Sequence, residues 1–244
     1  MKLNEGAYTC RAPCHLLHHP YRWRHYTTED KPIRRAKRRF VVWKKVGAEF
    51  CGTAFMVGIG CGSIALGWSS FAVSFTFGLA VCIAIICFGP ISGAHINPAV
   101  TLGFWRSGHL DKGLVLPYIV AQISGGFIGS LLTGGAGPTT PAKHVGLAEL
   151  VGIEIFITLL LMLSILFIIR KTSSIVAIAT WVGGTVALLA FSFGSLTGAS
   201  MNPARTIGPN LLSNHSSFIM IYVFSCCLGA ILASEFGLLK KNEE

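Results

Sequence analysis

The sequence predicts an all-α membrane protein with six transmembrane helices and two re-entrant half-helices, arranged as an inverted 3+3 repeat. Three observations support this fold class. Six apolar runs approach or exceed the roughly 20 residues that a helix needs to cross about 30 Å of hydrocarbon. Only 12% of the 244 residues are charged, against about 25% in a typical soluble domain. Two short segments of the chain are near copies of each other.

The apolar runs lie at about 46–67, 71–91, 113–133, 147–169, 175–195 and 217–239. They lack the period-2 alternation that the strands of a closed barrel require, so we expect helices. A membrane domain over 46–239 then contains two halves, about 46–133 and 147–239, and a short C-terminal segment follows at 240–244. Because charge at the centre of a bilayer is costly, membrane lipid is the expected partner of this domain.

The first 45 residues form a basic tail, which we expect to be disordered and cytoplasmic. The tail carries 12 of the 20 basic residues, and its run 34–45 abuts the first apolar run. Nucleic-acid binding is one interpretation, but a cytoplasmic anchor that obeys the positive-inside rule is favoured, so we expect no nucleic-acid partner. With this orientation, only Lys143 and Arg205 of the basic residues fall on the outer side. We therefore predict a multi-pass protein of the plasma or bacterial inner membrane, with both termini cytoplasmic.

The tail also contains a tract of thiol and imidazole side chains. Its members are Cys10, Cys14, His15, His18, His19 and His25. Their spacing matches no closed structural zinc site, so we expect no metal. We also expect no cofactor and no enzymatic activity, because no pairing of a nucleophile with a base is evident in the sequence.

Two Asn-Pro-Ala tripeptides, at 97–99 and 202–204, follow the second and fifth apolar runs. The segments that begin with them, 97–106 and 202–212, are too short to cross a bilayer. Asparagine is a good helix N-cap, and proline is a good residue for the first helical turn. Asn97 with Pro98, and Asn202 with Pro203, therefore predict two half-helices that enter the membrane from opposite faces.

The two tripeptides are 105 positions apart, and a second pair of motifs has the same offset. Glu49 and Thr53 in the first run match Glu154 and Thr158 in the fourth. Each half therefore contains three spans, and an odd number of spans forces the second half to be inverted in the membrane. The two glutamates lie within predicted spans and suit either a proton relay or a structural role, and their repetition favours the structural one.

The motifs together resemble those of the aquaporin, or major intrinsic protein, family. The resemblance covers about 46–239 and rests on Ser92-Gly93-Ala94-His95-x-Asn97-Pro98-Ala99-Val100-Thr101, on Gly198-Ala199-x-x-Asn202-Pro203-Ala204-Arg205, and on the two glutamates. It implies a homotetramer with one pore in each subunit. It also implies that Asn97 and Asn202 donate hydrogen bonds to passing water, and that Glu49 and Glu154 anchor the re-entrant loops. The implied pore carbonyls are those of Gly93, Ala94, His95, Gly198, Ala199 and Ser200.

By the same resemblance, an outer selectivity filter falls on Phe77, Ala190, Ala199 and Arg205. Strict water channels of the family usually carry histidine at the Ala190 position, and a methyl group there leaves a wider, more apolar constriction. Glycerol-type members usually carry aspartate after the arginine, where this chain has Thr206. Asn210 is another departure, since a small residue is usual there. The pattern is closer to the broader-specificity branch, which is nodulin-like or aquaglyceroporin-like.

The predicted function is a passive channel for water and small uncharged solutes that excludes ions and protons. Candidate solutes are glycerol, ammonia, urea, peroxide and metalloid hydroxides. A strictly water-selective channel is the main alternative. A secondary transporter is disfavoured, because Glu49 and Glu154 are the only candidates at depth for an ion-coupling pair. A non-conducting structural member is the remaining possibility.

Overall fold

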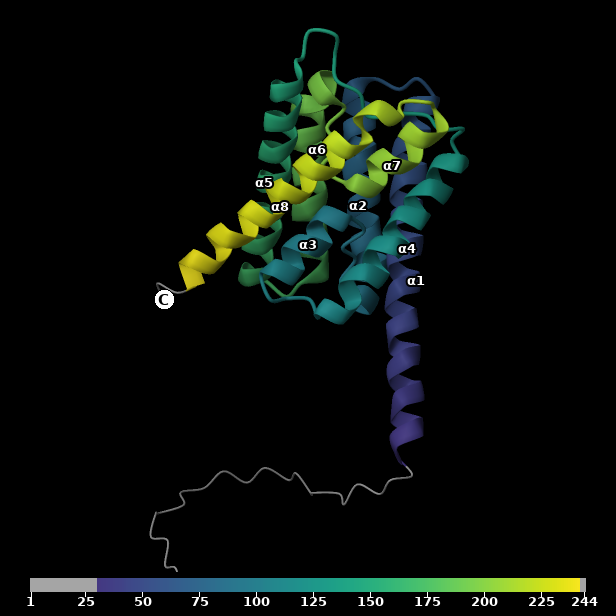
Figure 1. Ribbon diagram of the computed structural model, residues 1–244, viewed down its shortest axis with the longest axis vertical. Helices are drawn as coiled ribbons and strands as arrows, with labels where there is room; N and C mark the ends of the chain where they lie inside the picture. Colours follow the sequence, from purple (N-terminus) through teal and green to yellow (C-terminus); the bar gives the residue numbers. More distant parts are fainter. Residues whose placement is uncertain (1–29, 242–244) are drawn as a thin grey trace, which may run out of the picture. The chain divides into compact units, whose positions relative to one another are not determined.

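The computed structural model describes the backbone of residues 30–241 and the side chains of 39–236. The chain divides into a unit of residues 1–37 and a unit of residues 38–244, and the packing described below is that of the second unit. The helices of the described chain, labelled in Figure 1, are α1 (Asp30–Ala65), α2 (Ser70–Ser92), α3 (Pro98–Arg106), α4 (Lys112–Leu131), α5 (Leu147–Lys171), α6 (Ile175–Thr197), α7 (Pro203–Leu212), the 3-10 turn η1 (Ser216–Phe218) and α8 (Ile219–Lys241).

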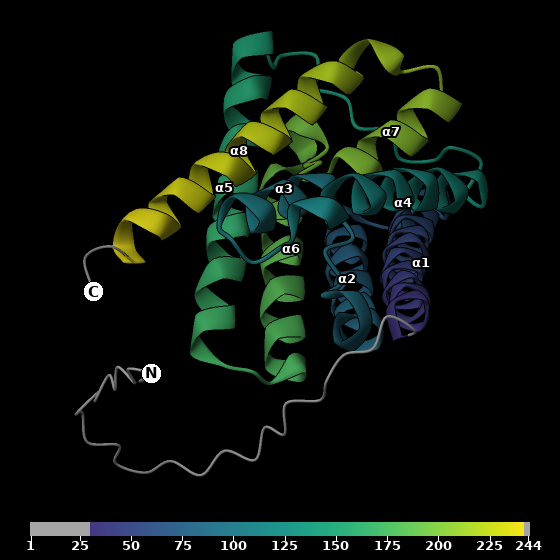
Figure 2. The ribbon, with the colours of Figure 1, turned by 60° about the horizontal axis from the view of Figure 1, so that its bottom comes forward.

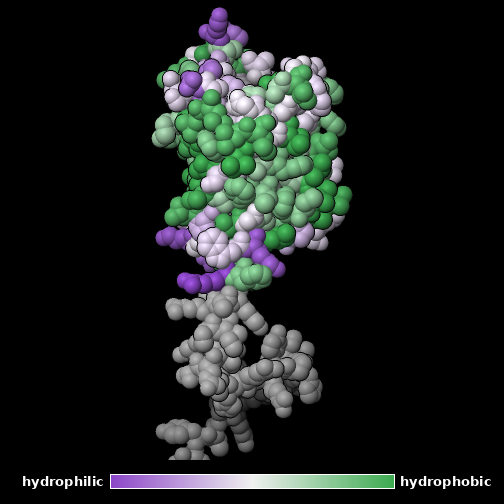
Figure 3. Space-filling model, turned by 90° about the vertical axis from the view of Figure 1, so that its right-hand side faces the viewer, coloured by the Kyte–Doolittle hydropathy of each residue, from purple (hydrophilic) through white to green (hydrophobic). Residues whose placement is uncertain are grey.

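Within the described residues, six helical segments are long and apolar enough to cross a membrane. They are Arg39–Ala65, Ser70–Ser92, Lys112–Leu131, Leu147–Lys171, Ile175–Thr197 and Ser216–Phe236. Figure 3 shows hydrophobic side chains in a broad band across one face, with hydrophilic residues at either end of that band. Large apolar side chains such as Phe75, Leu116 and Leu188 are exposed. The predicted all-α, six-span fold class is confirmed.

Helix α1 begins earlier than the sequence interpretation placed it. We expected disorder through residue 45, but the helix already includes 30–45. The only proline in this stretch, Pro32, lies in the first turn, where a missing N–H costs little. Extending an existing helix adds one hydrogen bond per residue without a new nucleation cost, so the membrane span continues into its basic flank. The Cys and His tract of the tail lies outside the described residues.

The two halves of the membrane domain pack against each other around α2 and α6. Gly78 of α2 lies against the carbonyl oxygen of Gly183 in α6, and Gly183 lies against the carbonyl of Gly78. These two glycines are 105 positions apart, the offset of the sequence repeat. The absence of a Cβ at both positions allows the helix backbones to touch. This reciprocal contact is what an inverted repeat requires where its pseudo-twofold axis crosses the helix pair.

The same symmetry relates the outer helix pairs. Gly125 of α4 lies against the backbone of Phe50 in α1, and Gly229 of α8 lies against the backbone of Ile155 in α5. Helix α3 packs mainly on α8, and α7 packs mainly on α4, so each half-helix rests on a span of the other half. Figure 2 shows α8 running beside α5 and α3. The half-helices are thereby held between the two repeats.

Candidate functional site

A cavity of about 800 Å³ runs through the membrane domain. Its lining includes Ile178, near the start of α6, and Ser195, near its end. At 1.5 Å per helical residue, these positions are about 25 Å apart along the helix. Apolar side chains of α2, α5 and α6, among them Ile85 and Ile165, form part of the wall. The cavity therefore extends through most of the hydrocarbon thickness and is partly apolar.

The segments before the half-helices form the polar part of the lining. All six residues predicted to supply pore carbonyls, Gly93, Ala94, His95, Gly198, Ala199 and Ser200, line the cavity. Their backbone is unusual, because Ala94, Ile96, Ala199 and Met201 have positive φ values between 41° and 51°. Such left-handed conformations are unfavourable for residues with a Cβ and persist only when surrounding contacts enforce them.

Glu49 of α1 holds the first of these segments. Its carboxylate accepts hydrogen bonds from the backbone N–H groups of His95 (3.0 Å) and Ile96 (2.7 Å). It is fully buried and does not line the cavity. The carboxylate therefore satisfies two backbone donors that the strained segment leaves without helical partners.

Glu154 of α5 holds the second segment in the same way. Its carboxylate accepts from the backbone N–H groups of Ser200 (3.0 Å) and Met201 (3.1 Å), and from the hydroxyl of Thr197 (2.6 Å). It too is fully buried and lies behind the cavity wall. The matching contacts in the two halves explain why the glutamates repeat at an offset of 105.

The two Asn-Pro-Ala tripeptides meet at the N-termini of α3 and α7. Each asparagine caps its own half-helix, because Asn97 Oδ1 accepts from Ala99 N (2.8 Å) and Asn202 Oδ1 accepts from Ala204 N (2.9 Å). Each side-chain amide also crosses to the other half. Asn97 Nδ2 donates to the Met201 carbonyl at 2.8 Å, and Asn202 Nδ2 donates to the Ile96 carbonyl at 2.9 Å.

Both asparagines line the cavity, whereas Pro98, Ala99, Pro203 and Ala204 are buried and do not line it. An amide carries two N–H groups, and the bond across the repeats uses one of them. The second N–H of each asparagine is therefore available at the cavity. The prolines contribute by starting the half-helices at the first helical position.

Arg205 lies two residues into α7, with its guanidinium fixed against the cavity wall. Its Nη1 donates to the carbonyl of Gly137 at 2.6 Å. The guanidinium carbon lies 5.0 Å from the centre of the Phe77 ring, within the range of a cation–π interaction. Phe77, Ala190, Ala199 and Arg205, the four predicted filter residues, all line the cavity. Side chains from α2, α6, α7 and the segment before α7 thus line the same cavity.

The family model described as major intrinsic protein matches residues 36–236. "Probable aquaporin NIP-type" of Nicotiana alata is 34% identical over 217 residues, covering 84% of this chain and 80% of that protein. "Aquaporin AqpM" of Methanothermobacter marburgensis is 33% identical over 234 residues, covering 78% of this chain and 94% of that protein. The chain belongs to the major intrinsic protein family.

A solved structure supports the fold of this major intrinsic protein. The aquaglyceroporin from Plasmodium falciparum aligns with a TM-score of 0.75, covering 80% of this chain and 95% of that one. The sequence identity is 24%, so this likeness concerns the fold alone. The family assignment and the fold class predicted from the repeated motifs are both confirmed.

Sequence reasoning missed two tyrosines that brace the re-entrant segments of this major intrinsic protein. The hydroxyl of Tyr118 in α4 donates to the Ser92 carbonyl at 2.8 Å, and the hydroxyl of Tyr222 in α8 donates to the Thr197 carbonyl. Both tyrosines are fully buried. They are 104 positions apart, so a search for repeats with a one-residue tolerance would have found them.

The same offset relates Gln122 to Cys226. Gln122 Nε2 donates to Glu49 (2.8 Å) and to the Thr101 hydroxyl (2.8 Å). In the second half, the Cys226 thiol makes a longer contact of 3.7 Å with Glu154. A thiol is a weak donor. Glu154 instead accepts a hydrogen bond from the hydroxyl of Thr197. The carboxylate is therefore held by a side-chain amide in the first half and by a hydroxyl in the second.

Proposed function

We propose that this major intrinsic protein is a passive channel for water and small uncharged solutes that excludes ions and protons. The observation that carries the proposal is the cavity that contains both asparagine amides and both strained carbonyl segments. A water molecule in this cavity can exchange its bulk hydrogen bonds for backbone acceptors and amide donors. The passage needs no large conformational change, because these groups are already held in place by Glu49 and Glu154.

Charge selectivity follows from the two half-helix N-termini and from Arg205. Each helix N-terminus carries roughly half a positive charge, and α3 and α7 direct theirs to the same part of the cavity. Asn97 and Asn202 add two N–H donors there, which favour a water oxygen over a cation. The guanidinium of Arg205 supplies a full positive charge further along the passage. Together these groups oppose the entry of cations and protons.

The buried glutamates favour a channel over an ion-coupled transporter. Glu49 and Glu154 lie behind the cavity lining, and their oxygens are occupied by backbone and side-chain donors. A coupling or relay carboxylate would have to meet the transported ion. Their geometry suits structural anchors of the re-entrant segments.

We propose that Phe77, Ala190, Ala199 and Arg205 form the selectivity filter. The ring and the two methyl groups give apolar walls, and the guanidinium gives fixed donors. The small side chain of Ala190 leaves room for solutes wider than water. Glycerol, ammonia, urea, peroxide and metalloid hydroxides are the candidate solutes, and a strictly water-selective channel is the alternative.

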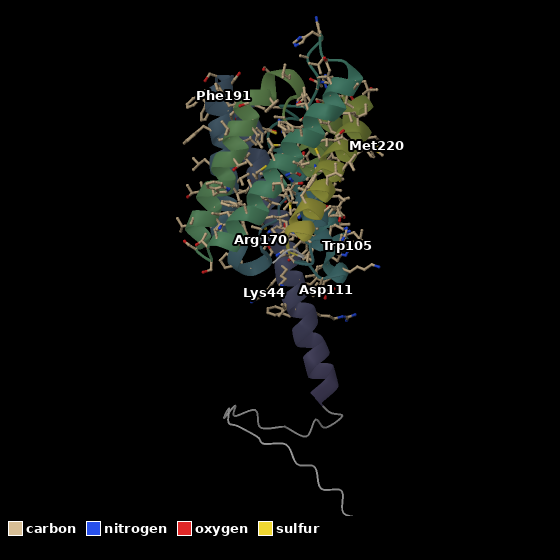
Figure 4. All side chains as sticks on the ribbon, turned by 90° about the vertical axis from the view of Figure 1, so that its left-hand side faces the viewer. Lys44, Trp105, Asp111, Arg170, Phe191 and Met220 are labelled. Atoms are coloured by element: carbon tan, nitrogen blue, oxygen red, sulfur yellow. The ribbon has the colours of Figure 1, made fainter. Side chains whose placement is uncertain are left out.

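The orientation proposed for the protein has both termini in the cytoplasm. Lys44 and Arg170 lie toward one end of the membrane domain, and Phe191 and Met220 lie toward the other (Figure 4). A cytoplasmic position for the basic end agrees with the positive-inside rule. We further propose a homotetramer embedded in lipid in the plasma or bacterial inner membrane, with one pore in each subunit.

Stopped-flow light scattering of proteoliposomes tests the proposal. Vesicles containing the protein should shrink faster than protein-free vesicles under an impermeant osmolyte, and should re-swell faster with a permeant neutral solute. The fluxes should be non-saturating and independent of sodium and proton gradients. Saturable, ion-dependent uptake would indicate a transporter, and unchanged osmotic responses would indicate a non-conducting protein. Fast water flux with no solute flux would favour the water-selective alternative.

A further inference from the structure

The loop that joins α4 to α5, residues 132–146, contributes to the cavity beside Arg205. Gly137, Pro138 and Thr140 of this loop line the cavity. Gly137 also supplies the carbonyl that accepts the 2.6 Å hydrogen bond from Arg205. The position of this carbonyl therefore determines where the guanidinium rests. A surface loop is normally mobile, so something must hold Gly137 in place.

Asn210, near the end of α7, pairs with the loop residue Thr139 through two hydrogen bonds between its side-chain amide and the Thr139 backbone. Thr139 N donates to Asn210 Oδ1 at 2.8 Å, and Asn210 Nδ2 donates to the Thr139 carbonyl at 2.8 Å. Nδ2 also donates to the carbonyl of His215 at 3.1 Å. Both Asn210 and Thr139 are fully buried. The amide thus binds the donor and the acceptor of one loop residue at once, which fixes that residue in position and orientation.

These contacts form a closed circuit of links between the loop and α7. Arg205 contacts Gly137, Pro138 follows, Thr139 pairs with Asn210, and α7 connects Asn210 back to Arg205. Two features make the loop part of this circuit stiff. Gly137 has a φ of 71°, which glycine adopts without strain. The pyrrolidine ring of Pro138 restricts the φ of that residue.

We propose that Asn210 is a positioning residue that holds the Arg205 side chain against the cavity wall. This inference rests on the proposed channel function and adds a determinant of its filter. Besides the Gly137 carbonyl, the guanidinium has only the Phe77 ring at 5.0 Å and a long 3.9 Å contact with the Cys61 thiol among the described residues. Without the loop carbonyl, this long cationic side chain swings into the cavity and obstructs the passage.

The test variant is Asn210→Ala, which removes both bonds to the Thr139 backbone. Its matched control is Thr139→Val, which keeps both backbone bonds. The control removes only the hydroxyl of Thr139, which contacts Thr206 Oγ1 at 2.9 Å and Asn210 Oδ1 at 3.2 Å. Each variant is compared with the wild type in proteoliposomes with equal amounts of folded channel. Osmotic water permeability is measured by stopped-flow light scattering.

We expect Asn210→Ala to lower water permeability about three- to tenfold, the equilibrium effect of a net loss of about one hydrogen bond. Thr139→Val should retain wild-type permeability. The decisive comparison uses the Arg205→Val background, where Asn210→Ala should have no further effect. Equal losses in both backgrounds would show general damage to the fold and overturn the proposal. Wild-type permeability of Asn210→Ala would overturn it as well, as would a loss in Thr139→Val equal to that in Asn210→Ala.

Hydrogen exchange in the full-length protein separates this inference from the proposed function. The backbone N–H of Thr139 is protected by its hydrogen bond to Asn210. Backbone amides in peptides covering 135–142 should therefore exchange faster in Asn210→Ala and at the wild-type rate in Thr139→Val. If wild-type vesicles respond to osmotic shock like protein-free vesicles, the channel function is wrong, whatever the exchange rates show. If the wild type conducts and exchange over 135–142 is unchanged in Asn210→Ala, only the positioning role is wrong.

Discussion

Gly60 of α1 controls the position of the Phe77 ring, so adding one methyl group there should narrow the cavity. A Cβ at residue 60 would lie 2.5 Å from Cζ of Phe77 and closer still to two other ring atoms. Carbon atoms in favourable contact are about 3.5–4.0 Å apart. In Gly60→Ala the ring must therefore move by about 1 Å. Because α1 lies behind the ring, the available direction is toward the cavity that Phe77 lines.

The effect on stability should be small, because two contributions oppose each other. Overpacking of this kind costs about 1–3 kcal/mol, and replacing glycine by alanine within a helix gains about 1 kcal/mol. The effect on permeation should be larger for wide solutes. A solute that must push the ring back against the new methyl group meets part of the overpacking cost, and about 1.4 kcal/mol corresponds to tenfold in rate. We expect glycerol permeability to fall about tenfold and water permeability by less than about threefold.

Stopped-flow measurements of water and glycerol flux in the same proteoliposomes test this prediction. Gly58→Ala and Gly62→Ala are matched controls in the same helix. Their added Cβ atoms would meet nothing closer than 3.7 Å and 3.8 Å, respectively. The reasoning is refuted if Gly60→Ala keeps the wild-type ratio of glycerol to water permeability. It is also refuted if either control changes that ratio equally.

Three further substitutions test the filter and the loop anchors. Ala190→His should narrow the cavity and reduce glycerol flux more than water flux, and an equal loss of both would contradict the assigned filter position. Arg205→Val should increase proton or ion leak, measured with a pH-sensitive dye inside the vesicles, and an unchanged leak would contradict its electrostatic role. Gln122→Met loses the bonds to Glu49 and Thr101 but relieves the buried, unpaired Gln122 Oε1. We expect a net destabilisation of about 1–2 kcal/mol in chemical unfolding in detergent. No loss of stability would mean that the backbone bonds alone hold Glu49.

The sequence was sufficient to predict the spans, the half-helices and the repeat. Hydropathy over about 20 residues reports whether a helix suits lipid, because the bilayer acts on each segment separately. The N-caps Asn97 and Asn202 and the prolines after them are local signals that act within one helical turn. The start of α1 was predicted less well. The apolar run begins near residue 46, but the helix begins at Asp30, because a helix does not have to start where the apolar residues start. Helix propagation depends on the backbone, which continues through the basic flank.

Only the tertiary structure decided which distant groups meet. The contact of Gly78 with Gly183, the bond from Gln122 to Glu49 and the pairing of Asn210 with Thr139 join segments tens of residues apart. No local pattern specifies such pairs, because they arise from helix packing and from the need of buried polar groups to find partners. The sequence by itself determined that two capped half-helices enter a membrane from opposite sides. The packing between the halves determined how Glu49 and Glu154 hold the strained carbonyls, and what holds Arg205 against the wall.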